Sequence, residues 1–384
     1  MDMNNSFPIS VEDFRHFAKK RLPNFLFDYI DGGSNDERTM AANIADFEDY
    51  CLKQQVMSDV GSVNTSTELC GQTASMPLAL APVGMAGMMA RRGEVQAAKA
   101  AKAAGVPFTC STVGVCSVEE IKQASTSIPW FQLYMLRDRD VVLQILERAK
   151  LAGCNTLIFT VDLAVAGMRH RDYRNGMLAE GLKAKWSMFS QLATRPRWLM
   201  DVGCLGGPHA IGNLSDVVDN PNSMAAFKAF IDSQFDPSVT WKDITWLRSV
   251  WDGKLIIKGV LEVDDARQAV DAGADGVVVS NHGGRQLDGV ASSISKLPAV
   301  VDALDKQIDV FMDGGVRSGI DVVKAVALGA KGVLIGRPWV WAMAARQEAG
   351  ITALLTRFQQ EIEVAMALMG VNRIAELNAD LIDH

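Results

Sequence analysis

The sequence has no uninterrupted apolar segment long enough to cross a bilayer, which takes about 20 residues. Its longest apolar stretch, Met76 to Ala90, is shorter and is broken by proline and glycine. Residues 1–6 have neither the basic start nor the apolar core of a signal peptide. These absences favour a cytoplasmic protein, or one that touches a membrane without crossing it.

The six cysteines include no Cys-x-x-Cys pair, so the sequence predicts neither a zinc site nor a redox dithiol, and no metal centre. Cys110 and Cys154 adjoin apolar runs, where a free thiol behaves as a small buried hydrophobe. An excess of basic residues is also missing, since 38 Lys and Arg stand against 45 Asp and Glu, a net charge of −7. This balance argues against a nucleic-acid binder.

A repeated unit is present along the 384 residues. Ala-rich helical patterns end at a glycine (Gly105, Gly153, Gly273 and Gly329), and each glycine is expected to take the left-handed conformation that ends a helix. An apolar run follows within a few residues. Eight such runs are present: Pro77–Val83, Pro107–Ser111, Trp130–Tyr134, Thr156–Asp162, Lys254–Gly259, Gly276–Asn281, Asp309–Gly315 and Gly332–Arg337.

Apolar runs without polar alternation indicate strands buried on both faces, as in a parallel sheet. Eight strands alternating with helices predict an α/β fold of the (β/α)8, or TIM barrel, type, with residues 1–384 in a single domain. A doubly wound open sheet is the alternative, although no Gly-x-Gly-x-x-Gly follows the first strand. We expect two additions: an N-terminal helical cap over residues 1–75, and an insertion over residues 163–239 after the fourth strand.

Polar side chains follow most of the predicted strands. Barrel active sites lie at the carboxyl ends of the strands, and seven of the eight runs end in residues able to do chemistry. These strand-end residues are Ser111, Gln132, Tyr134, Thr160, Asp162, Lys258, Ser280, Asn281, His282, Asp313 and Arg337. So many polar strand ends favour an enzyme over a purely structural barrel.

His282 lies just past the sixth strand, where it can serve as a general base near neutral pH; a structural histidine bonded to the loop is the alternative. Asp162 ends the fourth strand and can orient that histidine. A helix cap, or a salt bridge to Arg169 or Arg171, would explain Asp162 equally. Arg169 and Arg285 both lie just past strand ends and could clamp a carboxylate.

Lys258 lies within an apolar strand and needs an anionic partner, so it is either a Schiff-base nucleophile or the counter-charge to a cofactor anion. The segment 313–319 and the pair Gly336-Arg337 combine glycines, arginine and helix starts. Such a combination after the last two strands of a barrel is typical of a phosphate site. We therefore expect a phosphorylated cofactor or substrate.

The segment from Ser280 to Asp288 closely resembles the active-site signature of the FMN-dependent 2-hydroxy acid oxidases and dehydrogenases. The likeness spans nearly the whole chain, and the insertion and residues 251–258 are most similar to the respiratory, quinone-linked L-lactate dehydrogenase branch. Further matching segments are Leu22-Pro23, Asp28-Tyr29, Ala81–Gly84, Trp130–Tyr134, Thr160–Asp162, Lys258-Gly259 and Asp313–Arg317.

The resemblance implies FMN as cofactor and a role for each matching residue. His282 would be the catalytic base with Asp162 as its partner, and Lys258 would lie beside flavin N1. The substrate-binding residues would be Tyr29, Tyr134, Arg169 and Arg285. The flavin ring would contact Ala81, Pro82, Val83, Gly84, Ser111, Gln132, Thr160, Lys258 and Ser280. The ribityl chain and phosphate would contact Asp313, Gly314, Gly315, Arg317, Gly336 and Arg337.

Two positions bear on the reaction. Gly84 stands where oxidases of the family commonly carry alanine, which favours a dehydrogenase, and Val113 stands where glycolate oxidase has tryptophan. The resemblance thus implies oxidation of L-lactate to pyruvate, with electrons passed to quinone or another non-oxygen acceptor. Alternatives are an oxidase that makes hydrogen peroxide, an L-mandelate dehydrogenase, an FMN-dependent isomerase and a flavin-binding sensor. Family members are often tetramers, so we expect a homo-oligomer.

Residues 176–200 of the insertion carry an apolar stripe at helical spacing. The stripe consists of Leu182, Trp186, Phe189 and Leu192, flanked by Lys183, Lys185, Arg195, Arg197 and Trp198. Tryptophan and basic residues around such a stripe are typical of a helix in a bilayer interface, which predicts peripheral contact with the cytoplasmic face of the inner membrane. A helix covering the barrel or a neighbouring subunit has the same spacing, and this alternative stays open.

Overall fold

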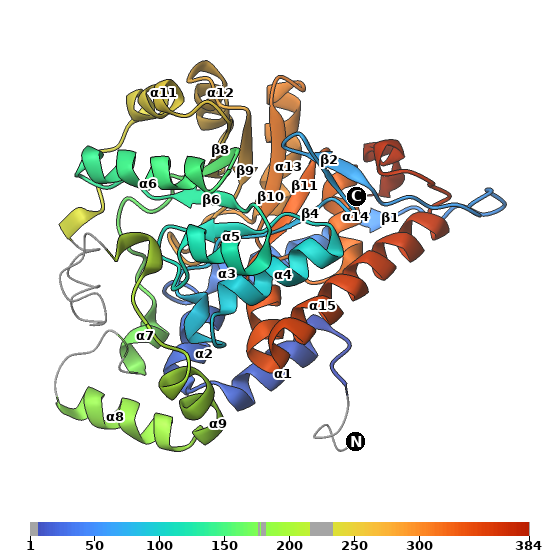
Figure 1. Cartoon of the computed structure of the whole chain (residues 1–384). Helices are drawn as coiled ribbons and strands as arrows, with labels where there is room; N and C mark the ends of the chain where they lie inside the picture. Colours follow the sequence, from blue (N-terminus) through green and yellow to red (C-terminus); the bar gives the residue numbers. More distant parts are fainter. Residues whose placement is uncertain (1–6, 176, 178–181, 216–232, 384) are drawn as a thin grey trace.

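The computed structural model describes residues 7–175, 177, 182–215 and 233–383. Its centre is a sheet of eight parallel strands in the order β4-β11-β10-β9-β8-β7-β6-β5 (Figure 1). The two outer strands meet, because Leu80 bridges Phe108 in parallel and its amide donates to the carbonyl of Pro107 at 2.9 Å. The sheet is therefore closed: the predicted TIM barrel is confirmed, and the open doubly wound sheet is excluded.

Each of the eight predicted runs coincides with one barrel strand, and only β8 extends beyond its run, by Val260. The strands are β4 (Leu78–Leu80), β5 (Thr109–Ser111), β6 (Trp130–Leu133), β7 (Thr156–Thr160), β8 (Lys254–Val260), β9 (Gly276–Val279), β10 (Asp309–Asp313) and β11 (Gly332–Ile335). Several runs were predicted too long at their carboxyl ends, because residues such as Asp162 and Asn281 have already left the ladder. Those residues form the loops of the rim.

Helices surround the barrel, as Figure 1 shows. They are α4 (Gly93–Ala104), α5 (Val118–Ser125), α6 (Arg139–Leu151), α11 (Trp241–Val250), α12 (Val263–Asp271), α13 (Ser293–Leu304), α14 (Gly319–Ala327) and α15 (Arg337–Leu368). The four predicted helix-ending glycines all have positive φ, from 69° at Gly105 to 101° at Gly329. Apolar side chains between strands and helices form the larger core, and Cys110 and Cys154 are buried in it as predicted.

The barrel interior is filled with side chains at its amino-terminal end. Trp130 and Phe311 meet edge to face there, with ring centroids 6.3 Å apart. A hairpin of β2 (Thr67–Leu69) and β3 (Gln72–Ala74) covers this end: Leu69 packs into the interior, and Gln72 bonds to Asn155 just before β7. Chemistry is thereby confined to the opposite, carboxyl-terminal end.

The N-terminal cap is helical in its first part. Ser10 caps α1 (Val11–Arg21) in a capping box with Asp13, and α2 (Asn24–Asp31) follows Pro23 and is capped by Gly32. Next come α3 (Arg38–Ala45) and the short helix η1 (Asp46–Asp49).

The prediction of a helical cap over all of residues 1–75 is wrong beyond Asp49. Residues 51–52 form β1 (Cys51–Leu52), which pairs with β12 (Ile382–Asp383) at the far end of the chain. The β2–β3 hairpin turns through Cys70 and Gly71, which both have positive φ. A two-residue turn of this kind matches the twist of two paired strands, so this segment forms a hairpin and not a helix.

The insertion contains α7 (His170–Arg174), α8 (Leu182–Ala193), α9 (Pro196–Trp198), the π-helix η3 (Leu199–Cys204) and the short helix η4 (Gly212–Leu214). Helices α7 and α8 contact α2, so the insertion lies against the N-terminal cap. No helix in the described part of the chain is long and apolar enough to span a membrane.

Candidate active site

A ring of buried polar side chains lies at the carboxyl ends of the barrel strands. Because all eight strands run parallel, their carboxyl ends share one rim, which residues far apart in sequence reach together. The buried polar residues of this rim are Ser111, Gln132, Thr160, Lys258, Ser280, Asn281 and Asp313. All of them were predicted as strand-end residues.

His282 and Asp162 are in direct contact across the rim. Nδ1 of His282 lies 2.8 Å from Oδ1 of Asp162, and both side chains are largely buried. His282 has a φ of 57°, and its amide donates to Oγ of Ser280 at 3.0 Å, which fixes the loop. Burial alone would raise the pKa of Asp162, but the charges of His282 and Lys258 outweigh it and the pKa is lowered. Asp162 is thus an ionised partner that can orient the imidazole and stabilise its protonated form.

The two arginines that could have formed a salt bridge with Asp162 are paired with other carboxylates. Arg169 pairs with Asp172 at 2.8 Å, and Arg171 pairs with Asp31 at 2.8 Å. The salt bridge from Asp162 to either arginine, which the sequence left open, is therefore not formed.

Lys258 is held by two neighbours at the rim. Its Nζ lies 2.9 Å from Oδ2 of Asp313 and 3.0 Å from Oγ of Ser280. Burial disfavours the charged amine, but Asp313 and Asp162 outweigh burial and raise the pKa of Lys258. A protonated amine is not a nucleophile, so the geometry favours the counter-charge role over a Schiff base.

Two arginines flank the ring of Tyr29. The guanidinium carbon of Arg285 is 5.2 Å from the ring centroid, and that of Arg169 is 5.9 Å from it. Burial and the positive charge of Arg169 together lower the pKa of Arg285. Two cations held side by side in a buried site are stabilised by an anion between them, and a carboxylate fits the guanidinium fork.

Tyr134 belongs to the same cluster. Burial raises the pKa of its hydroxyl, and the negative charge of Asp162 adds to that effect, while Arg285 and Arg169 oppose it. The phenol therefore stays protonated and can donate a hydrogen bond to a substrate oxygen. All four predicted substrate-binding residues thus meet near the His282–Asp162 pair.

Several residues that position the site were missed from the sequence. Phe235, from the end of the insertion, packs its ring 5.1 Å from that of Tyr134. Asn43 joins the cap to the rim, because it exchanges two side-chain hydrogen bonds of 2.8 Å with Asn281, which was predicted. No sequence pattern links these pairs. Asp172 could have been found, because it lies three residues after Arg169 on one helical turn.

Part of the rim fits the polar edge of a flavin. Gln132 Nε2 and Thr160 Oγ1 are buried and have no hydrogen-bond partner among the described residues, and the same holds for Asp313 Oδ1. The Gln132 amide is fixed in place, since its Oε1 accepts from Oγ of Ser111 at 3.0 Å. A buried polar atom without a partner costs about 1–3 kcal/mol, so these atoms fit a ligand that bonds to them.

A second part of the rim fits a phosphate. Burial lowers the pKa of Arg317 to about 10 and, together with the charges of Arg285 and Arg317, that of Arg337 to about 9. Gly314 and Gly315 have φ of 89° and 84°, and a Cβ on Gly315 would collide with the carbonyl of Asn43. The buried arginines and the glycine turn provide donors that an anion requires.

The loop after β4 lies beside this region. Ala81 is buried and its carbonyl accepts from Nε1 of Trp339 at 3.2 Å, while a Cβ on Gly336 would touch Ala81 and Val83. Pro82 is half-buried in the same loop. The predicted cofactor residues therefore come together, from β4 around to β11.

The barrel and its rim define an enzyme that binds a phosphorylated cofactor. The family model described as FMN-dependent dehydrogenase matches residues 18–384, so the chain belongs to the FMN-dependent dehydrogenase family. FMN is its cofactor, as the resemblance implied.

Individual relatives agree. The chain is 53% identical to an L-lactate dehydrogenase of Caulobacter vibrioides over 373 residues, 97% of either chain. It is 52% identical to an L-lactate dehydrogenase of Azorhizobium caulinodans over 371 residues, again 97% of each. Among solved structures, (S)-mandelate dehydrogenase, a monotopic membrane protein, superimposes with a TM-score of 0.92 at 34% identity, covering 98% of this chain and 100% of that one. Mandelate oxidase gives a TM-score of 0.82 at 37% identity, covering 98% of both chains.

Proposed function

We propose that this protein oxidises L-lactate to pyruvate at the rim of its barrel. The observation that carries the proposal is the contact between His282 and Asp162 beside the two guanidinium groups that flank Tyr29. That arrangement places a base next to a site for a carboxylate, and a 2-hydroxy acid offers both a carboxylate and a removable proton. The two L-lactate dehydrogenases, at 53% and 52% identity, favour lactate over mandelate.

Each residue of the rim has a role in this reaction. Arg169 and Arg285 bind the carboxylate, and Tyr29 and Tyr134 bind the substrate oxygens. His282 accepts a proton from the substrate, and the resulting imidazolium is stabilised by Asp162, whose Oδ1 lies 2.8 Å away. FMN, when bound, supplies the two-electron acceptor. Gln132, Thr160 and Ser280 hold its ring, and Arg317 and Arg337 hold its phosphate.

Lys258 contributes a fixed positive charge beside the flavin. Because its Nζ is held by Asp313 and Ser280 and its pKa is raised, the charge persists across the neutral pH range. A fixed cation favours electron transfer toward the cofactor.

An anaerobic spectral titration tests the substrate. The FMN-loaded protein receives L-lactate, D-lactate or L-mandelate in parallel, and the flavin absorbance is followed. We expect L-lactate to bleach the flavin and D-lactate to leave it oxidised. Bleaching by L-mandelate alone would show that the substrate is L-mandelate and not L-lactate. No bleaching by any of the three would overturn the proposal.

The electron acceptor is proposed to be quinone or a similar molecule rather than oxygen, because Gly84 stands where oxidases of the family commonly carry alanine. The surroundings of Gly84 leave little space for that methyl group: a Cβ there would be 2.7 Å from Cγ2 of Val113 and 3.4 Å from the Tyr29 hydroxyl. Comparing reoxidation of the reduced protein by air and by a quinone analogue tests this directly. Fast reoxidation by air would assign the protein to the oxidases that make hydrogen peroxide.

We expect Gly84→Ala to lower the rate of flavin reduction several-fold, because the new methyl group would collide with Val113 beside the hydroxyl of Tyr29, a proposed substrate-binding residue. The double variant Gly84→Ala/Val113→Ala should recover most of that rate, since the second change removes the colliding methyl. Anaerobic stopped-flow reduction by L-lactate measures both. A double variant as slow as Gly84→Ala alone would show that Val113 is not the cause.

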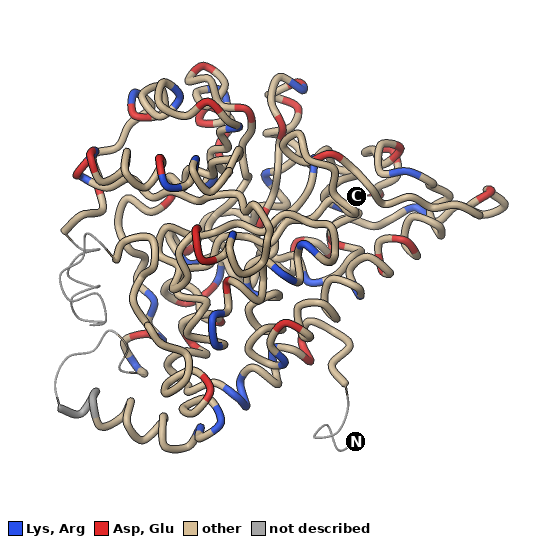
Figure 2. Tube along the Cα trace, viewed as in Figure 1, with Lys and Arg blue, Asp and Glu red and all other residues tan. Residues whose placement is uncertain are grey.

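Helix α8 is proposed to contact the cytoplasmic face of a membrane. Trp186 and Phe189 are 70% and 64% exposed, and their rings meet edge to face 6.1 Å apart. Leu192 instead packs against the core and Trp198 is buried, so the predicted stripe divides between protein and solvent. Figure 2 shows α8 uncharged over residues 186–193. The side chains of Leu182, Lys183 and Lys185 lie outside the described residues.

Replacing both exposed rings (Trp186→Ser/Phe189→Ser) should weaken binding to phospholipid vesicles about 100-fold, because two apolar side chains no longer enter the bilayer. Co-sedimentation with vesicles measures the binding. Leu151→Ser, which removes a leucine that is 73% exposed at the end of α6, is the matched control. Unchanged vesicle binding, with a change of oligomeric state in solution, would assign α8 to a subunit interface instead. The tetramer remains a prediction, which sedimentation analysis of the protein in solution would test.

A further inference from the structure

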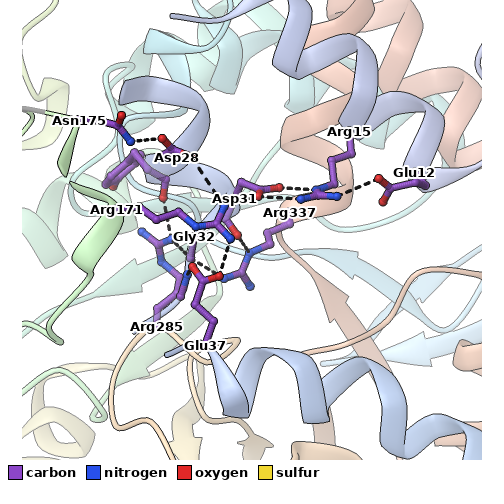
Figure 3. Close-up of polar contacts among 12 residues, drawn as sticks. Glu12, Arg15, Asp28, Asp31, Gly32, Glu37, Arg171, Asn175, Arg285 and Arg337 are labelled. Carbon is purple, nitrogen blue, oxygen red and sulfur yellow. Dashed lines mark hydrogen bonds and ion pairs between the residues drawn. The ribbon is translucent and has the colours of Figure 1, made fainter. Parts of the chain in front are cut away.

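One turn of chain, at the end of α2, serves both halves of the proposed site (Figure 3). The carbonyl of Gly32 accepts from Arg285 at 2.9 Å and from Arg337 at 2.8 Å. The carbonyl of Tyr29 accepts from Arg285 at 2.6 Å, and that of Asp31 accepts from Arg337 at 3.1 Å. The substrate arginine and the phosphate arginine are thus held by adjacent carbonyls of a single turn.

The carboxylate of Asp31 fixes this turn from behind. It is buried, and it pairs with Arg15 of α1 at 2.6 Å and with Arg171 of α7 at 2.8 Å. Burial would raise its pKa, but the two arginines outweigh burial and lower it. Asp31 therefore remains an anion between two cations that come from different elements.

Arg171 has further partners besides Asp31. Its guanidinium also pairs with Glu37, and its nearest atom to Asp28 is 3.7 Å from that carboxylate. Glu37 in turn accepts from the amide of Gly33 at 2.9 Å. A Cβ on Gly32 would meet Cδ of Arg171 at 3.3 Å, so the arginine stem lies against the turn itself.

Helix α7, which contains Arg171, also positions a substrate-binding residue. Arg169 immediately precedes α7, and its guanidinium pairs with Asp172 of that helix. Fixing Arg171 on α2 therefore fixes the helix from which Arg169 reaches Tyr29. A second contact, from Asn175 to Asp28, joins the end of α7 to α2.

We propose that Arg171 is a positioning residue that couples the substrate carboxylate site to the FMN phosphate site through the turn at Gly32. This inference rests on the proposed function. Without Arg171, the turn loses one of the two cations that hold Asp31, and the carbonyls that orient Arg285 and Arg337 become free to move. Affinity for a small carboxylate and affinity for FMN should then fall together.

The test compares Arg171→Met with Arg174→Met, which removes an exposed arginine from the same helix. Two constants are measured on the FMN-loaded protein: the dissociation constant of FMN, from the flavin fluorescence released on dilution, and that of oxalate, from its perturbation of the flavin spectrum. Oxalate is a carboxylate of the substrate's size that cannot be oxidised by loss of a Cα hydrogen.

We expect Arg171→Met to raise both dissociation constants about tenfold, the size expected for loss of one charge-assisted hydrogen bond. Arg171→Lys keeps the charge but loses the fork, and should recover part of both. Arg174→Met should leave both unchanged. A purely structural role would lower the unfolding temperature of Arg171→Met while leaving both constants alone, and that result would overturn the proposal, as would a change in only one of them.

If Arg171→Met does not fold, Arg171→Lys decides by the same criterion, because it keeps a charge near Asp31 but loses the fork: both dissociation constants should rise together, by less than tenfold. Failure of the proposed function is recognised separately. In that case no 2-hydroxy acid bleaches the unaltered protein, whereas the two dissociation constants are measured without turnover and still report on the coupling.

Discussion

Replacing His282 with glutamine is expected to slow reduction of the flavin by L-lactate about 100- to 10,000-fold, the usual contribution of a positioned general base. Glutamine can still donate to Asp162 but cannot accept a proton at neutral pH. Anaerobic stopped-flow spectroscopy at saturating L-lactate measures the rate. FMN content should be unchanged, since none of the proposed contacts of the FMN phosphate comes from the imidazole.

His16→Gln is the control for this experiment, because His16 lies on α1 with its ring against Phe17, away from the rim. The control should reduce its flavin at the original rate. If His282→Gln does so as well, the imidazole is a structural group bonded to Asp162, and another base must be sought.

Replacing Arg285 with methionine is expected to lower kcat/KM for L-lactate about 30- to 4,000-fold, because truncating one partner of a buried charge pair costs about 2–5 kcal/mol. Methionine fills the space of the arginine stem but has no charge for a carboxylate. Steady-state kinetics with a quinone analogue measures the loss, and Arg285→Lys should show a smaller one, because the ammonium keeps the charge without the fork.

The result for Arg285 also separates two reaction classes. A flavin barrel that isomerises a phosphorylated substrate has no need of the Tyr29, Arg169 and Arg285 cluster, and in that case Arg285→Met would keep its activity. Because Arg285 also donates to the carbonyls of Tyr29 and Gly32, flavin content must be measured in parallel. Arg174→Met provides the matched loss of a surface arginine.

The barrel could be predicted from the sequence because its signals are local. Each strand is a short apolar run, and the helices before β5, β7, β9 and β11 end at glycines that take positive φ. The contact between Asp162 and His282, which lie 120 residues apart, also followed, because parallel strands must bring their carboxyl ends together.

Features that depend on distant pairing could not be predicted. The strand at Cys51–Leu52 forms because Ile382–Asp383 pairs with it, and no local sequence pattern indicates that partner. A salt bridge from Asp162 to Arg171 was one alternative left open by the sequence, but α7 docks on α2 and brings Arg171 to Asp31 instead. Similarly, Phe235 reaches Tyr134 because residues 234–236 bond to the loop after β6.

The exposed stripe of α8 shows a further limit. Periodicity identified the helix but could not say which positions face the protein, since Trp186 and Leu192 both belong to its apolar stripe. The difference arises from the docking of α8 on α2, where Gln191 accepts from the amide of Phe25 at 2.9 Å. That contact turns the leucine inward and leaves the two aromatic rings in solvent.

A crystal structure of the FMN-loaded protein with pyruvate tests the central claim most directly. We predict that the pyruvate carboxylate lies between the guanidinium groups of Arg169 and Arg285, with its C2 oxygen toward His282 and the FMN phosphate against Arg317 and Arg337. A pyruvate bound away from His282, or a flavin whose phosphate lies elsewhere, would contradict the account.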